Sequence, residues 1–157
     1  KVALMIAKGA VTVIRKHGRE CYPNECCGVL VGITKDQEKK ALEAVPMENL
    51  RLNAEEADLL LPRESPDLES ERNRFLINPK EQLRIERETR AKGWKVLGYY
   101  HSHPDHPACP SNYDQDHGWP WYSYVILSVI RGNPEEMTSW VLKDDRSSFD
   151  SEPWTDL

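Results

Sequence analysis

Two histidines and an aspartate in the second half of the chain have the types and the spacing of a metal site. His101 and His103 are separated by one residue, and Asp114 follows at the end of the stretch 110–114. Alternate residues of a β-strand point to the same side, so both imidazoles could bind one cation if the apolar run 95–101 forms a strand. On a helix, this spacing would aim them to nearly opposite sides. Two imidazoles and one carboxylate suit zinc and leave a fourth position for water.

Ser111 stands three residues before Asp114 and directly after Pro110, where a helix should begin. On a helix the two side chains share a face, so Asp114 could face the strand-borne histidines across a strand–loop–helix crossing. The same pair is also typical of an ordinary helix cap, in which the serine oxygen and the third-position carboxylate bind free amides. A chance match to the whole H-x-H and S-x-x-D skeleton is rare, and this favours a site.

Other ionisable side chains lie close to this skeleton, namely Asp105, His106, Asp116 and His117. His106 falls beyond Pro104 in the expected loop, and His117 is out of phase with Asp114 on the expected helix. We therefore place these residues around the site or in solvent rather than among the ligands.

A hydrolase built on such a site needs a base that moves a proton from water to the leaving amine. Glu25 is the candidate, because it stands just before the apolar run 28–33, which has the profile of a buried strand. Apolar surroundings could raise the pKa of a carboxyl group there toward a useful range. On spacing alone, a loop glutamate exposed to water is the simpler interpretation.

Hydrophobic periodicity predicts helices and strands in alternation, and hence an α/β or α+β fold in one domain over residues 1–157. Helices are expected over residues 4–17 and from Pro79, where Asn78 is the cap and Gly93 ends the helix. Strands are expected over residues 28–33, 44–50, 95–101, 122–130 and 137–143. The polar segment 51–78 is either an extended insertion or a flap over the site.

Composition excludes several classes of function. The 157 residues include 21 basic and 26 acidic ones, for a net charge of −5, which gives no electrostatic reason to expect nucleic acid. No apolar run approaches the roughly 20 residues of a membrane span, and the first residues lack a secretory signal pattern. The cysteines are too few and too clustered for a disulfide framework, so we expect free thiols in a cytoplasmic protein. They are Cys21, Cys26, Cys27 and Cys109.

The sequence resembles the JAMM (MPN+) zinc metalloprotease family at every motif position. The segment 101–104, together with Ser111 and Asp114, matches the family pattern H-[ST]-H-P-x6-S-x-x-D, and Glu25 stands upstream in E-C-C-G-V-L-V-G. The resemblance implies a curved mixed β-sheet flanked by helices, similar to the cytidine deaminase arrangement. It also implies that the two histidines and Asp114 bind one zinc ion, that Glu25 is the general base, and that Ser111 stabilises the oxyanion.

The resemblance also bears on the substrate. Family members hydrolyse peptide or isopeptide bonds after the C-terminal tails of ubiquitin or ubiquitin-like proteins. Eukaryotic deubiquitinating members usually carry a long insertion after the motif aspartate, but here a strand is expected soon after Asp114, from Tyr122. The compact form is similar to prokaryotic members, some of which act on ThiS-like sulfur-carrier proteins. The expected partner is therefore a ubiquitin-like or sulfur-carrier protein with a Gly-Gly tail, and the oligomeric state stays open, with a homodimer possible.

Four other interpretations are compatible with parts of the sequence. A deubiquitinase-like isopeptidase would use the same residues on ubiquitin-type conjugates, and a non-catalytic MPN interaction module could keep the metal for stability. A zinc deaminase would need a P-C-x-x-C ligand pair, whereas the order Cys109-Pro110 is reversed and lacks a second cysteine at that spacing. A cysteine-based site at Cys26 and Cys27 is disfavoured, because free cysteines at the start of a buried strand usually serve packing.

Overall fold

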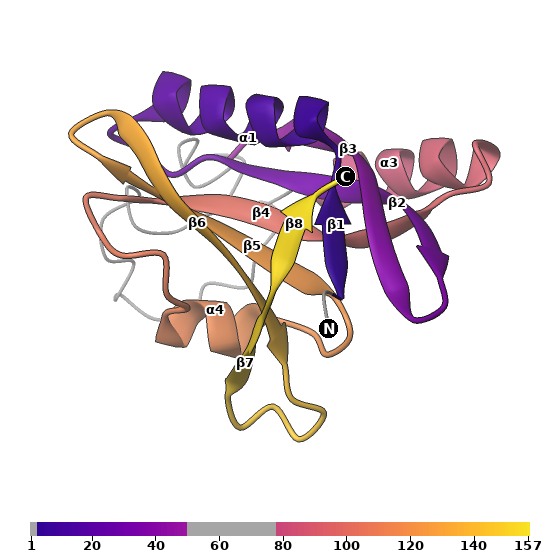
Figure 1. The fold of residues 1–157 in the computed structure, drawn as a ribbon. Coiled ribbons are helices and arrows are strands. Elements are labelled where there is room, and N and C mark those ends of the chain that lie inside the picture. The colour runs from indigo at the N-terminus through magenta and orange to yellow at the C-terminus, as the bar shows by residue number, and fades with distance from the viewer. Residues whose placement is uncertain (1–2, 50–77) are drawn as a thin grey trace.

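The computed structural model describes residues 3–49 and 78–157, and these residues form one curved sheet with helices outside it. The strands are β1 (Leu4–Ile6), β2 (Cys27–Lys35), β3 (Glu38–Met47), β4 (Lys95–Pro104), β5 (Ser123–Ile130), β6 (Asn133–Leu142), β7 (Phe149–Glu152) and β8 (Trp154–Asp156). The helices are α1 (Lys8–Cys21), α3 (Pro79–Ala91) and α4 (Asn112–His117). The sheet order is β7-β6-β5-β4-β2-β3-β1-β8. Because β7 and β8 are consecutive in the chain yet form its two ends, the sheet must curve until it is nearly a barrel (Figure 1).

Strand β2 lies near the middle of the sheet and separates two apolar clusters. It pairs antiparallel with β3 on one side and with β4 on the other. Leu30 packs in the larger cluster with Ile14 of α1 and Leu127 of β5, whereas Val29 packs in the smaller cluster with Ile85 of α3. Alternate side chains of β2 therefore face different helices, and this explains why its sequence is apolar without interruption.

The position of β4 depends on the tyrosine that directly precedes the first histidine of the H-x-H motif. Tyr100 is fully buried, and its hydroxyl oxygen lies 2.7 Å from Nδ1 of His17 on α1. A Cβ atom on Gly28 would lie 2.1 Å from Cε2 of this ring, so only a glycine leaves room for it. Strand β4, and His101 with it, is thereby fixed between α1 and β2.

The curved mixed sheet flanked by helices confirms the fold class, and several boundaries differ from the sequence analysis. The first helix begins at Lys8, because residues 4–6 instead pair in parallel with β3 and β8. These pairings override a helix-like apolar spacing. Strands β3 and β6 start earlier than expected, at Glu38 and Asn133, and only Arg131 and Gly132 make the turn before β6. Strands β1, β7 and β8 were missed altogether.

The second expected helix is confirmed at both ends. The Asn78 side chain accepts a hydrogen bond from the Lys80 amide at 2.9 Å, and Gly93 follows the helix with φ +74. Apart from Asn78, the segment 51–78 lies outside the described residues, so the choice between insertion and flap stays a prediction. No helix in the two described ranges has the length and apolarity needed to cross a membrane.

Candidate metal centre

Strand β4 carries both histidines of the motif on one side, as the strand interpretation requires. It pairs in parallel with β5, with His101 opposite Ile126 and His103 opposite Ser128. The Nε2 atoms of His101 and His103 lie 3.1 Å apart, and the two side chains are 1% and 12% exposed. Two imidazole nitrogens are thus directed at one point beneath the surface.

Helix α4 adds a carboxylate to the same point. Asp114 Oδ1 lies 3.2 Å from His101 Nε2, and Asp114 Oδ2 lies 3.4 Å from His103 Nε2. In a tetrahedral zinc site with bonds of about 2.0–2.1 Å, two ligand atoms lie about 3.3 Å apart. Each separation is close to that value, with His101 nearest one aspartate oxygen and His103 nearest the other, so the three side chains converge closely enough to hold a zinc ion.

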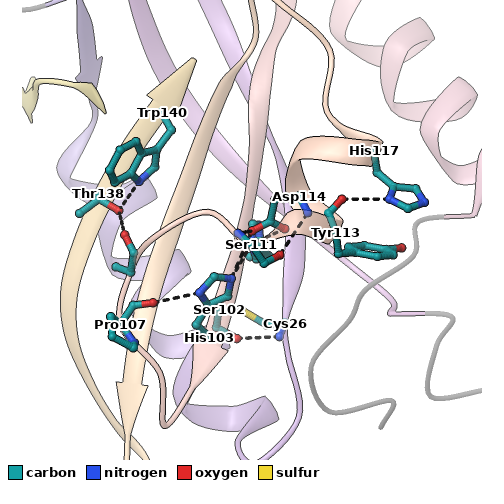
Figure 2. Close-up of polar contacts among 12 residues, drawn as sticks. Cys26, Ser102, His103, Pro107, Ser111, Tyr113, Asp114, His117, Thr138 and Trp140 are labelled. Atoms are coloured by element: carbon teal, nitrogen blue, oxygen red, sulfur yellow. Dashed lines mark hydrogen bonds and ion pairs between the residues drawn. The ribbon is translucent and has the colours of Figure 1, made fainter. Parts of the chain in front are cut away.

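Further contacts orient two of the three donors, His103 and Asp114. His103 Nδ1 lies 3.0 Å from the Pro107 carbonyl oxygen, and because a carbonyl only accepts, this nitrogen carries the proton and leaves Nε2 with a lone pair (Figure 2). The Asp114 carboxylate accepts a hydrogen bond from the Ser111 amide at 2.8 Å. Second contacts of this kind are typical of metal ligands.

Asp114 is held in its ionised form. Burial alone would raise the pKa of this carboxyl group, because a charged form loses solvation. The neighbouring imidazoles and a hydrogen bond from the Ser111 amide outweigh burial and lower the pKa of this carboxyl group well below its ordinary value. The carboxylate is therefore available as a ligand across the neutral range.

Glu25 reaches this centre from the segment that directly precedes strand β2. Its side chain is 2% exposed, and a carboxylate oxygen lies within 4.8 Å of a ring nitrogen of both His101 and His103. The interpretation as an exposed loop glutamate is therefore wrong. The next residue pairs with the H-x-H motif, since the Cys26 amide donates to Ser102 Oγ at 2.8 Å (Figure 2).

Ser111 has the helix-cap role that the sequence analysis left open. The Asp114 amide donates to Ser111 Oγ at 3.1 Å, and the reciprocal bond from the Ser111 amide completes a capping box. A hydroxyl that accepts one hydrogen bond still has its own hydrogen to donate. Ser111 is exposed and lines an open pocket with Trp140 and Phe149. Capping and a contact with substrate are thus compatible.

The loop between the histidines and α4 is tied to the strands beside it. The Ser128 hydroxyl donates to the His106 carbonyl, and the Thr138 hydroxyl donates to the Ala108 carbonyl, each at 2.6 Å. Trp140 Nε1 in turn donates to the Thr138 hydroxyl at 2.8 Å (Figure 2). These contacts, which involve strands β5 and β6, fix the distance between the H-x-H motif and Asp114.

The neighbouring ionisable residues make other contacts. His117 Nδ1 lies 2.9 Å from the Tyr113 carbonyl, on the far side of α4 from His103 (Figure 2). Asp105 accepts hydrogen bonds from Tyr22 and from the Arg131 amide. His106 and Asp116 have exposed side chains. These placements agree with their position outside the expected ligand set.

Two buried residues that hold Glu25 were missed by sequence reasoning. Asn49 Nδ2 donates to the Glu25 carbonyl at 3.1 Å, and Ser102 bonds to Cys26. The serine between the two histidines belongs to the motif and could have been singled out. Asn49 comes from the end of β3 and has no local signal, because only the folded sheet brings it to Glu25.

The comparisons with known proteins agree with this geometry. The model of the family described as prokaryotic homologs of the JAB domain matches residues 7–143. The chain belongs to this family.

A Haloferax volcanii protein named desampylase is 30% identical over 131 residues, 80% of each chain. A solution structure from Desulfitobacterium hafniense has a TM-score of 0.76 with 28% identity, over 98% of this chain and 92% of that one. A JAB1/MPN domain protein from Archaeoglobus fulgidus shares the fold, with a TM-score of 0.55 and 17% identity over 98% of both chains.

Membership of the JAB family confirms the resemblance stated above. It also agrees with the compact form of the region after the motif aspartate. Helix α4 ends at His117 and β5 begins at Ser123, so only residues 118–122 connect them. This connection has no room for a long insertion.

Proposed function

We propose that this JAB-family chain is a zinc-dependent metallopeptidase or isopeptidase. It hydrolyses the bond after the C-terminal Gly-Gly tail of a ubiquitin-like or ThiS-like sulfur-carrier protein. The observation that carries the proposal is the set of separations of 3.1, 3.2 and 3.4 Å among His101, His103 and Asp114, with buried Glu25 beside them. The desampylase relative supports an isopeptidase that acts on a ubiquitin-like modifier.

Each site residue has one task in the proposed reaction. His101, His103 and Asp114 would hold one zinc ion per chain, and the ion would supply a Lewis acid that polarises the substrate carbonyl and activates water. Glu25 accepts a proton from the attacking water and delivers it to the leaving nitrogen, which avoids release of an unstable amide anion. Its burial keeps bulk water from competing for that proton. Ser111 donates its hydroxyl hydrogen to the oxygen that becomes negative.

The short connection 118–122 supports a small carrier rather than a ubiquitin chain as the substrate. A glycine pair has no side chains, so it can pass close to the buried metal centre where bulkier residues would collide. The site itself is compatible with either modifier, since the ligands and the base would be the same. A cytoplasmic location, which the free cysteines favour, belongs to the same proposal.

Cleavage of matched substrates tests the proposal. The full chain, loaded with zinc, is mixed either with a ThiS-like carrier extended by a short peptide past its Gly-Gly, or with ubiquitin dimers. We expect mass spectrometry to show the carrier cut directly after Gly-Gly. If only the ubiquitin dimers are cut, the carrier is not the substrate and the chain acts as a deubiquitinase. If neither substrate is cut, the chain is a non-catalytic module.

A further inference from the structure

The segment that carries Glu25 is joined at two places, one on each side of the glutamate, to strand β4 and to the residue that directly follows it. We propose that Tyr22 and Asp105 are positioning residues, whose hydrogen bond holds Glu25 at the metal centre. The inference rests on the proposed role of Glu25 as general base. The two residues are 83 positions apart in sequence, and the Tyr22 hydroxyl donates to Asp105 Oδ2 at 2.7 Å.

Asp105 is a firmly held acceptor. Its other carboxylate oxygen accepts a hydrogen bond from the Arg131 amide at 2.8 Å. Its own amide donates to the Val129 carbonyl at 2.7 Å, so both ends of the residue are bonded to β5 and the following turn. Asp105 also follows the second metal-facing histidine by only two residues. A displacement of its carboxylate would therefore require a displacement of the strand end that carries His103.

Tyr22 is equally restricted. Its ring packs against the larger apolar cluster, and it borders Gly132, where an added Cβ would lie 3.6 Å from Tyr22 Cδ1. The Tyr22 amide donates to the Gly18 carbonyl at the end of α1. With the ring and the backbone fixed, the hydroxyl is directed at Asp105 rather than free to choose a partner.

The second junction lies on the other side of Glu25. The Cys26 amide donates to Ser102 Oγ, and the Ser102 amide donates to the Cys26 carbonyl at 3.1 Å. Glu25 thus lies between Cys26, bonded to the middle of the H-x-H motif, and Tyr22, bonded to Asp105 two residues beyond that motif. Loss of the Tyr22 hydroxyl contact would remove the hydrogen bond that links one side of this segment to Asp105 and leave the link on the other side intact. The carboxylate would then sample more positions relative to the histidines.

Such a loss should affect proton transfer more than substrate binding. A general base must lie within about 2.6–3.2 Å of the atom whose proton it takes, so small displacements matter. A hydrogen bond to a charged group is stronger than one between neutral groups, but at an exposed position water replaces part of what its removal loses. We therefore expect kcat to fall about three- to tenfold in Tyr22→Phe, with KM and zinc content unchanged.

The test uses Tyr22→Phe, Asp105→Gly and the double variant. Glycine tolerates the positive φ of 58 at residue 105, so this change removes the carboxylate without backbone strain. Tyr122→Phe and Asp144→Asn are the controls, because they remove the same kinds of group elsewhere. Amide hydrogen exchange of residues 22–27 is measured on the metal-free chain. Hydrolysis of the extended ThiS-like carrier is measured on the zinc-loaded chain.

We expect faster exchange of residues 22–27 in both single variants, a lower kcat at constant KM, and no further loss in the double variant. If amide exchange is unchanged in Tyr22→Phe, the proposed positioning role of the Tyr22–Asp105 hydrogen bond is wrong. Faster exchange with an unchanged kcat would contradict it as well. If the unaltered chain cuts no carrier, the proposed function fails. In that case the exchange measurement, which needs neither metal nor substrate, still decides whether the contact holds the segment.

Discussion

Two buried carboxylates adjoin the histidine pair, and their surroundings differ. Asp114 is buried, which favours its neutral form, but the imidazoles and the Ser111 amide lower its pKa well below the ordinary value. Glu25 approaches from another segment, where the Asn49 side chain donates to its backbone carbonyl and a carboxylate oxygen lies within 4.8 Å of both imidazoles. A carboxylate locked among donors suits a permanent metal ligand. A carboxylate on a segment held from both sides suits proton transfer.

Replacement of Glu25 separates these two tasks. Because we propose Glu25 as the base and not as a ligand, Glu25→Gln should retain about one zinc per chain and lose roughly 10²- to 10⁴-fold in kcat. Zinc content by elemental analysis and turnover of the extended carrier measure the two effects on one preparation. Glu48→Gln changes an exposed glutamate directly after β3 and is the control. Zinc lost together with activity would instead make Glu25 a ligand.

At the scale of secondary structure, the site depends on a very short helix. Helix α4 has 6 residues, and a helix of that length is not stable without tertiary contacts. Gln115 supplies such contacts, because its Nε2 donates to the carbonyl of Arg146 at 3.1 Å and to that of Ser147 at 2.6 Å. The turn between β6 and β7 therefore holds the helix that carries Asp114.

Gln115→Ala should weaken zinc binding without removing a ligand. Outer contacts of metal ligands commonly contribute 10- to 100-fold in affinity, and we expect a loss toward the lower end of that range. Competition with a chelator of known affinity measures the zinc dissociation constant. Asp116→Ala changes the adjacent, exposed side chain and should leave the zinc dissociation constant unchanged. Equal affinities in all chains would show that the capping box alone places Asp114.

The same elements show what the sequence could predict and what it could not. The strand at 95–101, the cap at Ser111 and the helix at Pro79 have local signals in periodicity and capping, and the structure contains them. Strands β1, β7 and β8 have only three or four residues each, too few for periodicity to be read. Their pairing is set by distant partners, as is the contact of Asn49 with Glu25.

At the scale of the whole molecule, a buried polar network joins strands from both halves of the curved sheet. Lys39 of β3 donates to Ser123 Oγ at 3.0 Å and to the Trp121 carbonyl. Ser123 and Ser139 both donate to Glu152 Oε1, at 2.7 and 2.8 Å. Lys39 and Glu152 are each 8% exposed. Strands β3, β5, β6 and β7 thus meet at a charge pair bridged by a serine, inside a sheet that closes almost completely.

Removal of the anion alone should be costly. In Glu152→Ala the Lys39 ammonium stays buried without a counter-ion, which typically lowers the free energy of unfolding by about 3–5 kcal/mol. Burial lowers the pKa of Lys39 more than nearby Glu152 raises it. The loss of unfolding free energy in Glu152→Ala should therefore shrink as the pH rises toward the ordinary lysine range. The reason is that the folded chain loses the Lys39 proton at a lower pH than the unfolded chain does.

Urea unfolding of the chelator-treated chain at several pH values measures both effects. The double variant Lys39→Met with Glu152→Ala removes both charges and should recover most of the loss, since a buried pair can often be replaced by apolar residues. Glu136→Ala, an exposed glutamate on β6, is the control and should change little. If Glu152→Ala unfolds at the same urea concentration as the unaltered chain, the network does not hold the curved sheet closed. Apolar contacts such as those of Trp154 would then have to do so.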